Sequence, residues 1–156
     1  MSTIRERIVA AAVTALATDA PPGVPAPVRT RLDSPSADEI PALTVYQATE
    51  TVEAMRDLKA GGVSRGPVVR RSVLLIIEVL TKAGAGEEPD KAADPILAWA
   101  TKALGAAGTL GGLANHPADE VGTKFEYEQA ETSFCRSTMT FRFQYQSRAD
   151  DAELIT

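Results

Sequence analysis

Hydrophobic residues are most concentrated in residues 67–82, PVVRRSVLLIIEVLTK, which contain the apolar run VLLII. Many of these side chains are β-branched, and β-branched residues fit a pleated sheet better than a helix because rotation about χ1 is restricted. We therefore predict a long central strand with one face in the core and the other apolar only in its middle. Apolar residues also recur at helical spacing, so a helix is the alternative interpretation. The fully apolar face carries Val69, Val73, Leu75, Ile77 and Val79.

The first segment of the chain has the pattern of an amphipathic helix. Residues 2–18 repeat apolar side chains every four positions. Thr3 and Glu6 have the spacing of a capping box, in which a hydroxyl and a carboxylate satisfy free backbone N–H groups. Residues 27–33 and 41–49 then alternate apolar and polar side chains, which predicts two strands.

Residues 50–66 mix both charge signs with three glycines and few strongly apolar side chains. We interpret this segment as a long, mobile connection to the central strand. Long connections in compact domains are usually functional or disordered. A solvated loop and an interaction surface both remain open.

A second helix is predicted over residues 90–104, and Asp94 before Pro95 marks an alternative later start. We expect Trp99 to lie at the rim of this helix and to pack over the sheet. The predicted buried stripe contains Ile96, Leu97, Ala100, Ala103 and Leu104.

The last third of the chain predicts an antiparallel hairpin formed by residues 123–129 and 137–146. Alternation gives the hairpin a polar outer face and an aromatic inner face, and it places Arg142 opposite Glu126 or Glu128. The tail, residues 148–156, is short and acidic, and we expect it to be loose. The predicted aromatic face contains Phe125, Tyr127, Phe141, Phe143 and Tyr145.

These elements predict a single α+β domain spanning residues 1–156. It has a mainly antiparallel, mixed β-sheet of four to five strands with two α-helices packed on one face. With 44% hydrophobic and 24% charged residues, the composition is that of a soluble globular protein. The net charge of −5 disfavours a general nucleic-acid binder. No apolar run reaches the length that spans a bilayer, and the amino terminus lacks the apolar core of a signal peptide, so we expect no membrane partner.

Candidate chemistry is sparse. The chain has one cysteine, Cys135, and one histidine, His116, so a cysteine-based zinc site is excluded and few nucleophile–base pairs are possible. The glycines of residues 83–86 lack the lysine and hydroxyl of a phosphate-binding loop. We expect no catalytic residue, no cofactor and no metal, and we favour a structural or assembly protein over an enzyme.

The order of these segments resembles the tail terminator proteins of long-tailed bacteriophages, the minor tail protein U-like family and its prophage relatives. The resemblance covers nearly the whole chain but contains no sharp chemical motif. The segments that carry it are IRERIVAAAVTAL, PALTVYQATE, RRSVLLIIEVLTKA, DPILAWATKAL, TLGGL and KFEYEQAETSFCRSTMTFRFQYQSR.

The resemblance implies a non-enzymatic protein of the virion tail that is assembled in the host cytoplasm. Such proteins form a homo-hexameric ring on the last ring of the major tail tube protein, stop tube polymerisation and offer a surface to the head–tail neck protein. DNA passes through the lumen without being read, and an acidic subunit agrees with a lumen that repels DNA. Whether the free subunit is a monomer remains open.

Candidate contacts between subunits come from the residues themselves. A segment with both charge signs can pair with a neighbouring copy in a head-to-tail ring. The candidates are Arg56, Asp57, Lys59 and Arg65 in the charged connection, with Arg70 and Arg71 at the start of the central strand.

Three other functions remain open. The first is a neck or tail-completion protein of the same phage tail. The second is a small cytosolic ligand-binding domain or enzyme, which would need a pocket where Tyr46, Trp99 and His116 converge with glutamates. The third is a generic interaction module, which no motif supports.

Overall fold

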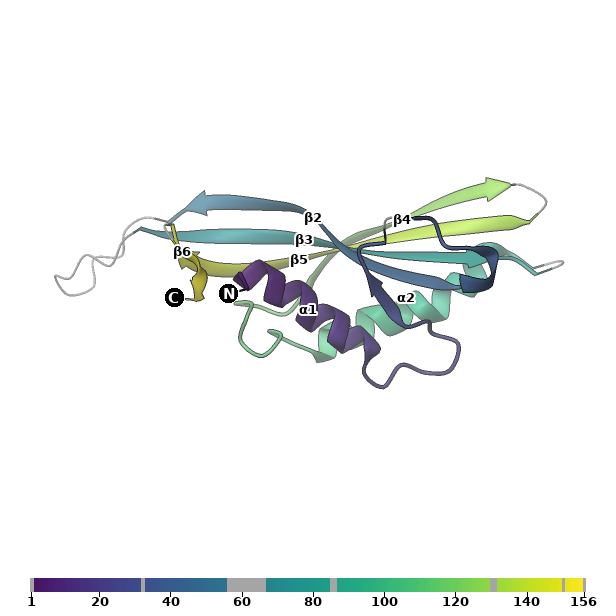
Figure 1. The fold of residues 1–156 in the computed structure, drawn as a ribbon, viewed down its shortest axis with the longest axis horizontal. Coiled ribbons are helices and arrows are strands. Elements are labelled where there is room, and N and C mark those ends of the chain that lie inside the picture. Colours follow the sequence, from purple (N-terminus) through teal and green to yellow (C-terminus); the bar gives the residue numbers. More distant parts are fainter. Residues whose placement is uncertain are drawn as a thin grey trace.

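A fifteen-residue strand, β3 (Val68–Lys82), runs through the middle of a mixed sheet with two helices on one face (Figure 1). The computed structural model describes residues 2–31, 33–55, 67–84, 87–129, 132–149 and 151–155. The face of β3 predicted to be apolar is buried, and Val73, Leu75, Ile77 and Val79 are fully inaccessible to solvent. The predicted central strand is therefore confirmed, and the helix alternative is wrong.

The sheet has the order β1–β2–β3–β5–β4, and a sixth strand, β6, pairs with β5. Among the described strands, only β1 and β2 pair in parallel; the other pairs are antiparallel. The predicted α+β class with a mainly antiparallel, mixed sheet is confirmed, and β6 is one strand more than predicted. The other strands of the sheet are β1 (Pro27–Arg29), β2 (Ala42–Ala54), β4 (Asp119–Gln129), β5 (Ser133–Arg148) and β6 (Asp151–Ile155).

The helices α1 (Ile4–Ala17) and α2 (Pro89–Ala106) lie side by side under the same face of the sheet (Figure 1). We call this face the inner face and the opposite one the outer face. At the start of α1, only the hydroxyl half of the predicted capping box is present: the hydroxyl of Thr3 accepts a hydrogen bond from the backbone N–H of Glu6 at 3.3 Å. The Glu6 carboxylate pairs with Arg29 instead. The alternative start of α2 at Asp94 is wrong. The helix already begins at Pro89, in the first turn where a proline is tolerated, and Pro95 lies inside it.

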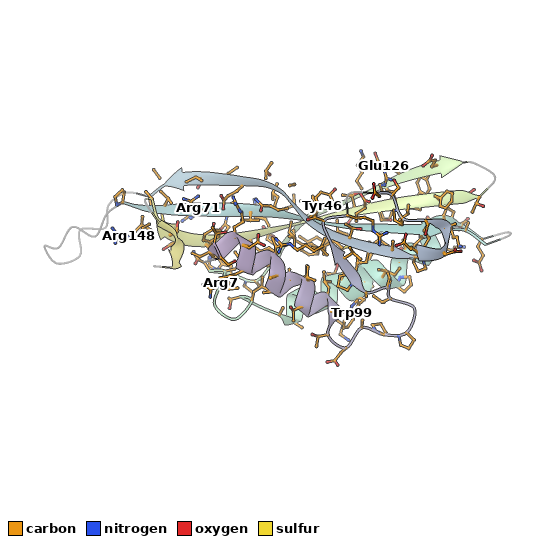
Figure 2. The ribbon with its side chains drawn as sticks, viewed as in Figure 1. Arg7, Tyr46, Arg71, Trp99, Glu126 and Arg148 are labelled. Atoms are coloured by element: carbon orange, nitrogen blue, oxygen red, sulfur yellow. The ribbon has the colours of Figure 1, made fainter. Side chains whose placement is uncertain are left out.

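The core fills the space between the helices and the inner face. All five residues of the predicted α2 stripe are buried, together with the apolar side of α1. Trp99 is half-buried where the two helices meet, and its indole N–H donates to the backbone oxygen of Leu16 at 3.4 Å (Figure 2). The predicted rim position of Trp99 is confirmed. Neither described helix is long and apolar enough to cross a membrane.

Several segment boundaries differ from the prediction. Strand β2 continues to Ala54, so residues 50–54 belong to the sheet and not to the connection. Strand β1 is only three residues long because the chain leaves the sheet at Thr30, whose φ is +46°. Residues 151–155, predicted to be loose, form β6 against the end of β5.

The hairpin of β4 and β5 is present, but its inner face is covered only on β5. Phe141, Phe143 and Tyr145 are buried as predicted, whereas Phe125 and Tyr127 are 41% and 59% exposed. The prediction for β4 is wrong because β4 is an edge strand, and its aromatic side chains are not packed into the core.

The predicted partner of Arg142 is also wrong. Strand β4 begins at Asp119, and its register places Arg142 opposite Asp119, with which it forms an ion pair. Glu126 lies opposite Arg136 instead. The weak periodicity of residues 109–122 is compatible with the lead-in of a strand, but it does not define where β4 begins, and a register shift between Glu120 and Gly122 interrupts the alternation.

Candidate functional site

An irregularity in β2 places a carboxylate on the inner face of the sheet. Up to Gln47, odd-numbered residues of β2 face inward, since Val45 lies opposite Ile77. The register shifts between Gln47 and Thr49, and Glu50 then lies opposite Val73 on the inner face. A bulge adds one residue to one strand and so changes which side chains point inward. Simple alternation from Val45 would have put Glu50 on the outer face.

Glu50 is the centre of a half-buried polar group. Its side chain is 13% exposed, and the Tyr145 hydroxyl donates to its Oε1 at 2.6 Å. The guanidinium groups of Arg5 and Arg71 each lie 3.4 Å from its Oε2. Arg71 also donates from Nε to the Ser147 hydroxyl at 2.9 Å. We call these five residues the Glu50 cluster.

The Glu50 cluster joins four elements at one end of the sheet. Arg5 comes from α1, Glu50 from β2, Arg71 from β3, and Tyr145 and Ser147 from β5. Figure 2 shows Arg71 on β3 above the first turns of α1. Paired charges with additional hydrogen bonds hold their elements in a defined arrangement, and removing one partner leaves the other uncompensated. The cluster therefore fixes the start of α1 against the sheet.

Tyr145 acts as a hydrogen-bond donor in this cluster. Burial raises the pKa of the Tyr145 phenol far above its ordinary value, and the hydrogen bond to Glu50 and the charge of Glu50 raise it further. The phenol stays protonated at neutral pH, so its O–H remains available to Glu50. This arrangement favours a structural role for the pair.

The sequence contained two signals for this cluster that the prediction did not use. Arg71 has the same parity as Val69 and Val73, which puts a charge on the face predicted to be apolar. Tyr145 lies in a buried row, and a buried tyrosine hydroxyl usually has a hydrogen-bond partner. Neither signal identifies Glu50, because the bulge is not visible in the alternation.

The two adjacent candidate arginines point to opposite faces, as successive residues of a strand must. Arg71 is 14% exposed and is engaged in the Glu50 cluster. Arg70 is on the outer face, and its guanidinium lies 3.9 Å from Glu53 with both side chains largely exposed. Arg70 is thus the described candidate that is accessible to a neighbouring subunit. The other candidates, Arg56, Asp57, Lys59 and Arg65, lie outside the described residues.

A polar cleft of about 480 Å³ lies where the segment after β1 passes over the sheet. Three arginines line it, and each has a carboxylate partner within the chain. Arg29 pairs with Glu6 at 2.6 Å, Arg31 with Glu39 at 3.0 Å and Arg136 with Glu78 at 3.7 Å. The hydrogen bond to Arg29 lowers the pKa of Glu6, which keeps this carboxylate charged. The cleft therefore has little uncompensated positive charge.

The converging pocket required by the ligand-binding alternative is not formed by the described residues. Tyr46 lines the polar cleft, where burial, and after it the charge of Glu78, raises the pKa of its phenol. Trp99 lies between the helices, and His116 lines a separate hollow beside Arg142. Within the described ranges, no group of three or more histidine, cysteine or acidic side chains could hold a metal ion.

Comparison with known proteins adds no assignment. No protein-family model matches the chain, and no curated protein matches it either.

Proposed function

We propose that this protein is a non-enzymatic phage tail subunit, a tail terminator that caps the end of the tail tube as a ring. The ring stops tube polymerisation, offers a joining surface to the neck of the head and lets DNA pass. We take it to be a homo-hexamer of the virion tail that assembles in the host cytoplasm. The proposal combines the resemblance in segment order with the architecture of the sheet.

The observation that carries the proposal is the outer face of the sheet, which neither helix covers (Figure 1). A ring subunit needs separate surfaces for two neighbours, the tube and the neck. On the outer face, Leu74 and Leu80 are half-buried on either side of the buried Ile76, and Arg70 and Lys82 are exposed at the two ends of β3. An apolar centre with a charged rim is typical of a protein interface.

The charges of the outer face agree with a lumen that does not hold DNA. A protein binds DNA through unbalanced positive charge, because phosphate contacts dominate affinity. On the outer face, Arg70, Arg136 and Arg142 form ion pairs with Glu53, Glu78 and Asp119. Where this face borders the lumen, such pairs reduce the attraction to phosphate.

The test is the arrest of tube growth. We would add the purified protein to the major tail tube protein of the same phage or prophage during polymerisation, and measure tube lengths and tube ends by electron microscopy. We expect shorter tubes with a ring at one end. Tubes of unchanged length with bare ends would overturn the proposal.

A second arm separates the terminator from a neck protein of the same machine. Finished tails that carry the ring should join to heads, and tails without it should not. If the protein leaves tube growth unchanged but is needed for joining, it is a tail-completion protein and not a terminator.

A further inference from the structure

Exposed large apolar side chains gather at the two edges of the sheet. None lies on α1, α2, β3 or β5 among the described residues. Large apolar groups exposed on a soluble protein commonly mark an interaction site. The exposed residues are Val28 on β1, Val52 on β2, and Val121, Phe125 and Tyr127 on β4.

Two stretches of strand edge have no partner among the described strands. Strand β1 covers β2 only at residues 43–45, and β6 pairs with the far end of β5. This leaves residues 49–54 of β2 on one side of the sheet and β4 on the other. A long uncovered edge presents unpaired N–H and C=O groups to any strand that can approach.

The directions of these two edges are complementary. Each of the steps from β2 to β3, β5 and β4 is antiparallel, so β4 runs opposite to β2. A neighbour placed head to tail in the same orientation therefore brings its own β2 antiparallel to β4. Repetition of this contact extends the sheet from subunit to subunit. It is a heterologous contact, and such contacts form a ring when the rotation between neighbours closes.

We propose that β4 of one subunit pairs with residues 49–54 of β2 in a second copy, with Phe125 opposite Val52. The proposal rests on the ring proposed above and identifies its subunit contact. Phe125 lies opposite Ser137 and Val52 opposite Arg71, so both side chains project on the inner face. Main-chain hydrogen bonds supply the affinity of such strand addition, and side-chain pairs supply the register.

Charge selects this register. With Phe125 opposite Val52, Lys124 lies opposite Glu53, and Glu126 and Glu128 lie opposite threonines. Opposite charges across two strands are favourable and like charges are not. A shift by two residues in one direction brings Glu126 opposite Glu53. The opposite shift puts Phe125 against Glu50 and loses the pair between Lys124 and Glu53.

The alternative partner for the β4 edge is the β4 strand of a second copy, related by a two-fold axis. This pairing places Phe125 opposite itself and gives a closed dimer. The head-to-tail arrangement is favoured because one contact covers exposed apolar side chains of both β4 and β2, whereas the dimer leaves Val52 exposed.

Mixed cysteine variants test the pairing directly. Phe125→Cys and Val52→Cys are made in separate chains, mixed, and oxidised; residues directly opposite in a sheet are close enough for a disulfide. We expect a covalent dimer in the mixture, with little in either variant alone. A dimer from Phe125→Cys alone would show the two-fold pairing, and no mixed dimer at the highest soluble concentration would overturn the proposal.

Charge-reversal variants test the register of β4 against β2 independently. Lys124→Glu and Glu53→Lys should each weaken association about tenfold, and the double variant in one chain should recover most of the loss. Lys102→Glu, on the exposed side of α2, is the control with the same charge change. Within the chain, Glu53 pairs with Arg70 and Lys124 pairs with Glu126, and both ion pairs are exposed. The temperature of thermal unfolding should therefore remain unchanged in both variants. No recovery in the double variant would contradict the register.

The outcomes separate this contact from the proposed function. Rings on tube ends without the mixed disulfide would keep the terminator and reject the contact. A mixed disulfide in subunits that never cap a tube would keep the contact and reject the terminator.

Discussion

Tyr145 and Glu50 are 95 positions apart in the sequence, yet the Tyr145 hydroxyl donates to the Glu50 carboxylate at 2.6 Å. The two residues lie on strands that do not touch, because β3 separates β2 from β5. Their contact passes over Arg71 of the intervening strand, which pairs with the same carboxylate. The hydrogen bond therefore ties three strands together under the start of α1.

Removal of this hydroxyl should destabilise the fold. Tyr145→Phe keeps the buried ring but leaves the half-buried carboxylate with one donor fewer. We expect the free energy of unfolding in urea to fall by about 1–3 kcal/mol, the range for a hydrogen bond to a charged group. Tyr127→Phe removes a hydroxyl from an exposed ring and should change stability by less than about 0.5 kcal/mol. Equal stabilities of the two variants would show that the Tyr145 contact contributes nothing.

The same pair predicts a loss of stability at alkaline pH. The folded protein raises the pKa of Tyr145 above the ordinary value of 10.0, so it binds the phenolic proton more tightly than the unfolded chain does. This contribution is complete below pH 10 and is lost as the pH rises above it. Tyr145→Phe should lack this part of the alkaline decline in unfolding free energy.

Tyrosinate absorbance provides the direct measurement. The difference between the wild-type and Tyr145→Phe titrations isolates this phenol from Tyr46 and Tyr127. We expect no ionisation of Tyr145 near its ordinary pKa while the protein remains folded. Ionisation there in the folded protein would contradict the buried donor role.

Periodicity was sufficient to predict the elements that have an uninterrupted pattern. The β3 face from Val69 to Val79 and the α2 stripe from Ile96 to Leu104 are buried as expected, because a regular strand or helix fixes which side chains share a face. Alternation also identified Phe125 and Phe143 as residues of one face. It could not show that Phe125 stays largely exposed, because exposure depends on packing across the sheet.

The Glu50 cluster was not predictable for a different reason. One extra residue between Gln47 and Thr49 changes the parity of β2, and neither residue is of a type that marks a bulge. The charge pattern at the start of the central strand does not distinguish Arg70 from Arg71, although the pleat places them on opposite faces. A local pattern predicts faces only as far as the register continues unbroken.

The contrast between the core and the edge is testable with two phenylalanines. Phe143 is fully buried, and Phe143→Ala should lower the free energy of unfolding by about 3–5 kcal/mol through lost burial and the cavity left behind. Phe125→Ala, on the exposed edge, should cost less than about 1 kcal/mol in the monomer. Urea denaturation at low protein concentration measures both. If Phe125→Ala costs as much as Phe143→Ala, the β4 face is covered after all.

Arg70 and Arg71 can be compared directly, because the same sequence pattern predicts both as residues of the subunit interface. Arg71→Glu places a second carboxylate beside Glu50 and removes the donor to Ser147, so the monomer should lose about 3–5 kcal/mol of stability. Arg70→Glu removes only an exposed ion pair and should leave the monomer within about 0.5 kcal/mol of the wild type.

Thermal unfolding measures the stability of both monomers, and sedimentation in the presence of tail tubes measures assembly. We expect folded Arg70→Glu to assemble more weakly than the wild type. Unchanged assembly would remove Arg70 from the interface, and a stable Arg71→Glu monomer would show that the Glu50 cluster does not hold the end of the sheet.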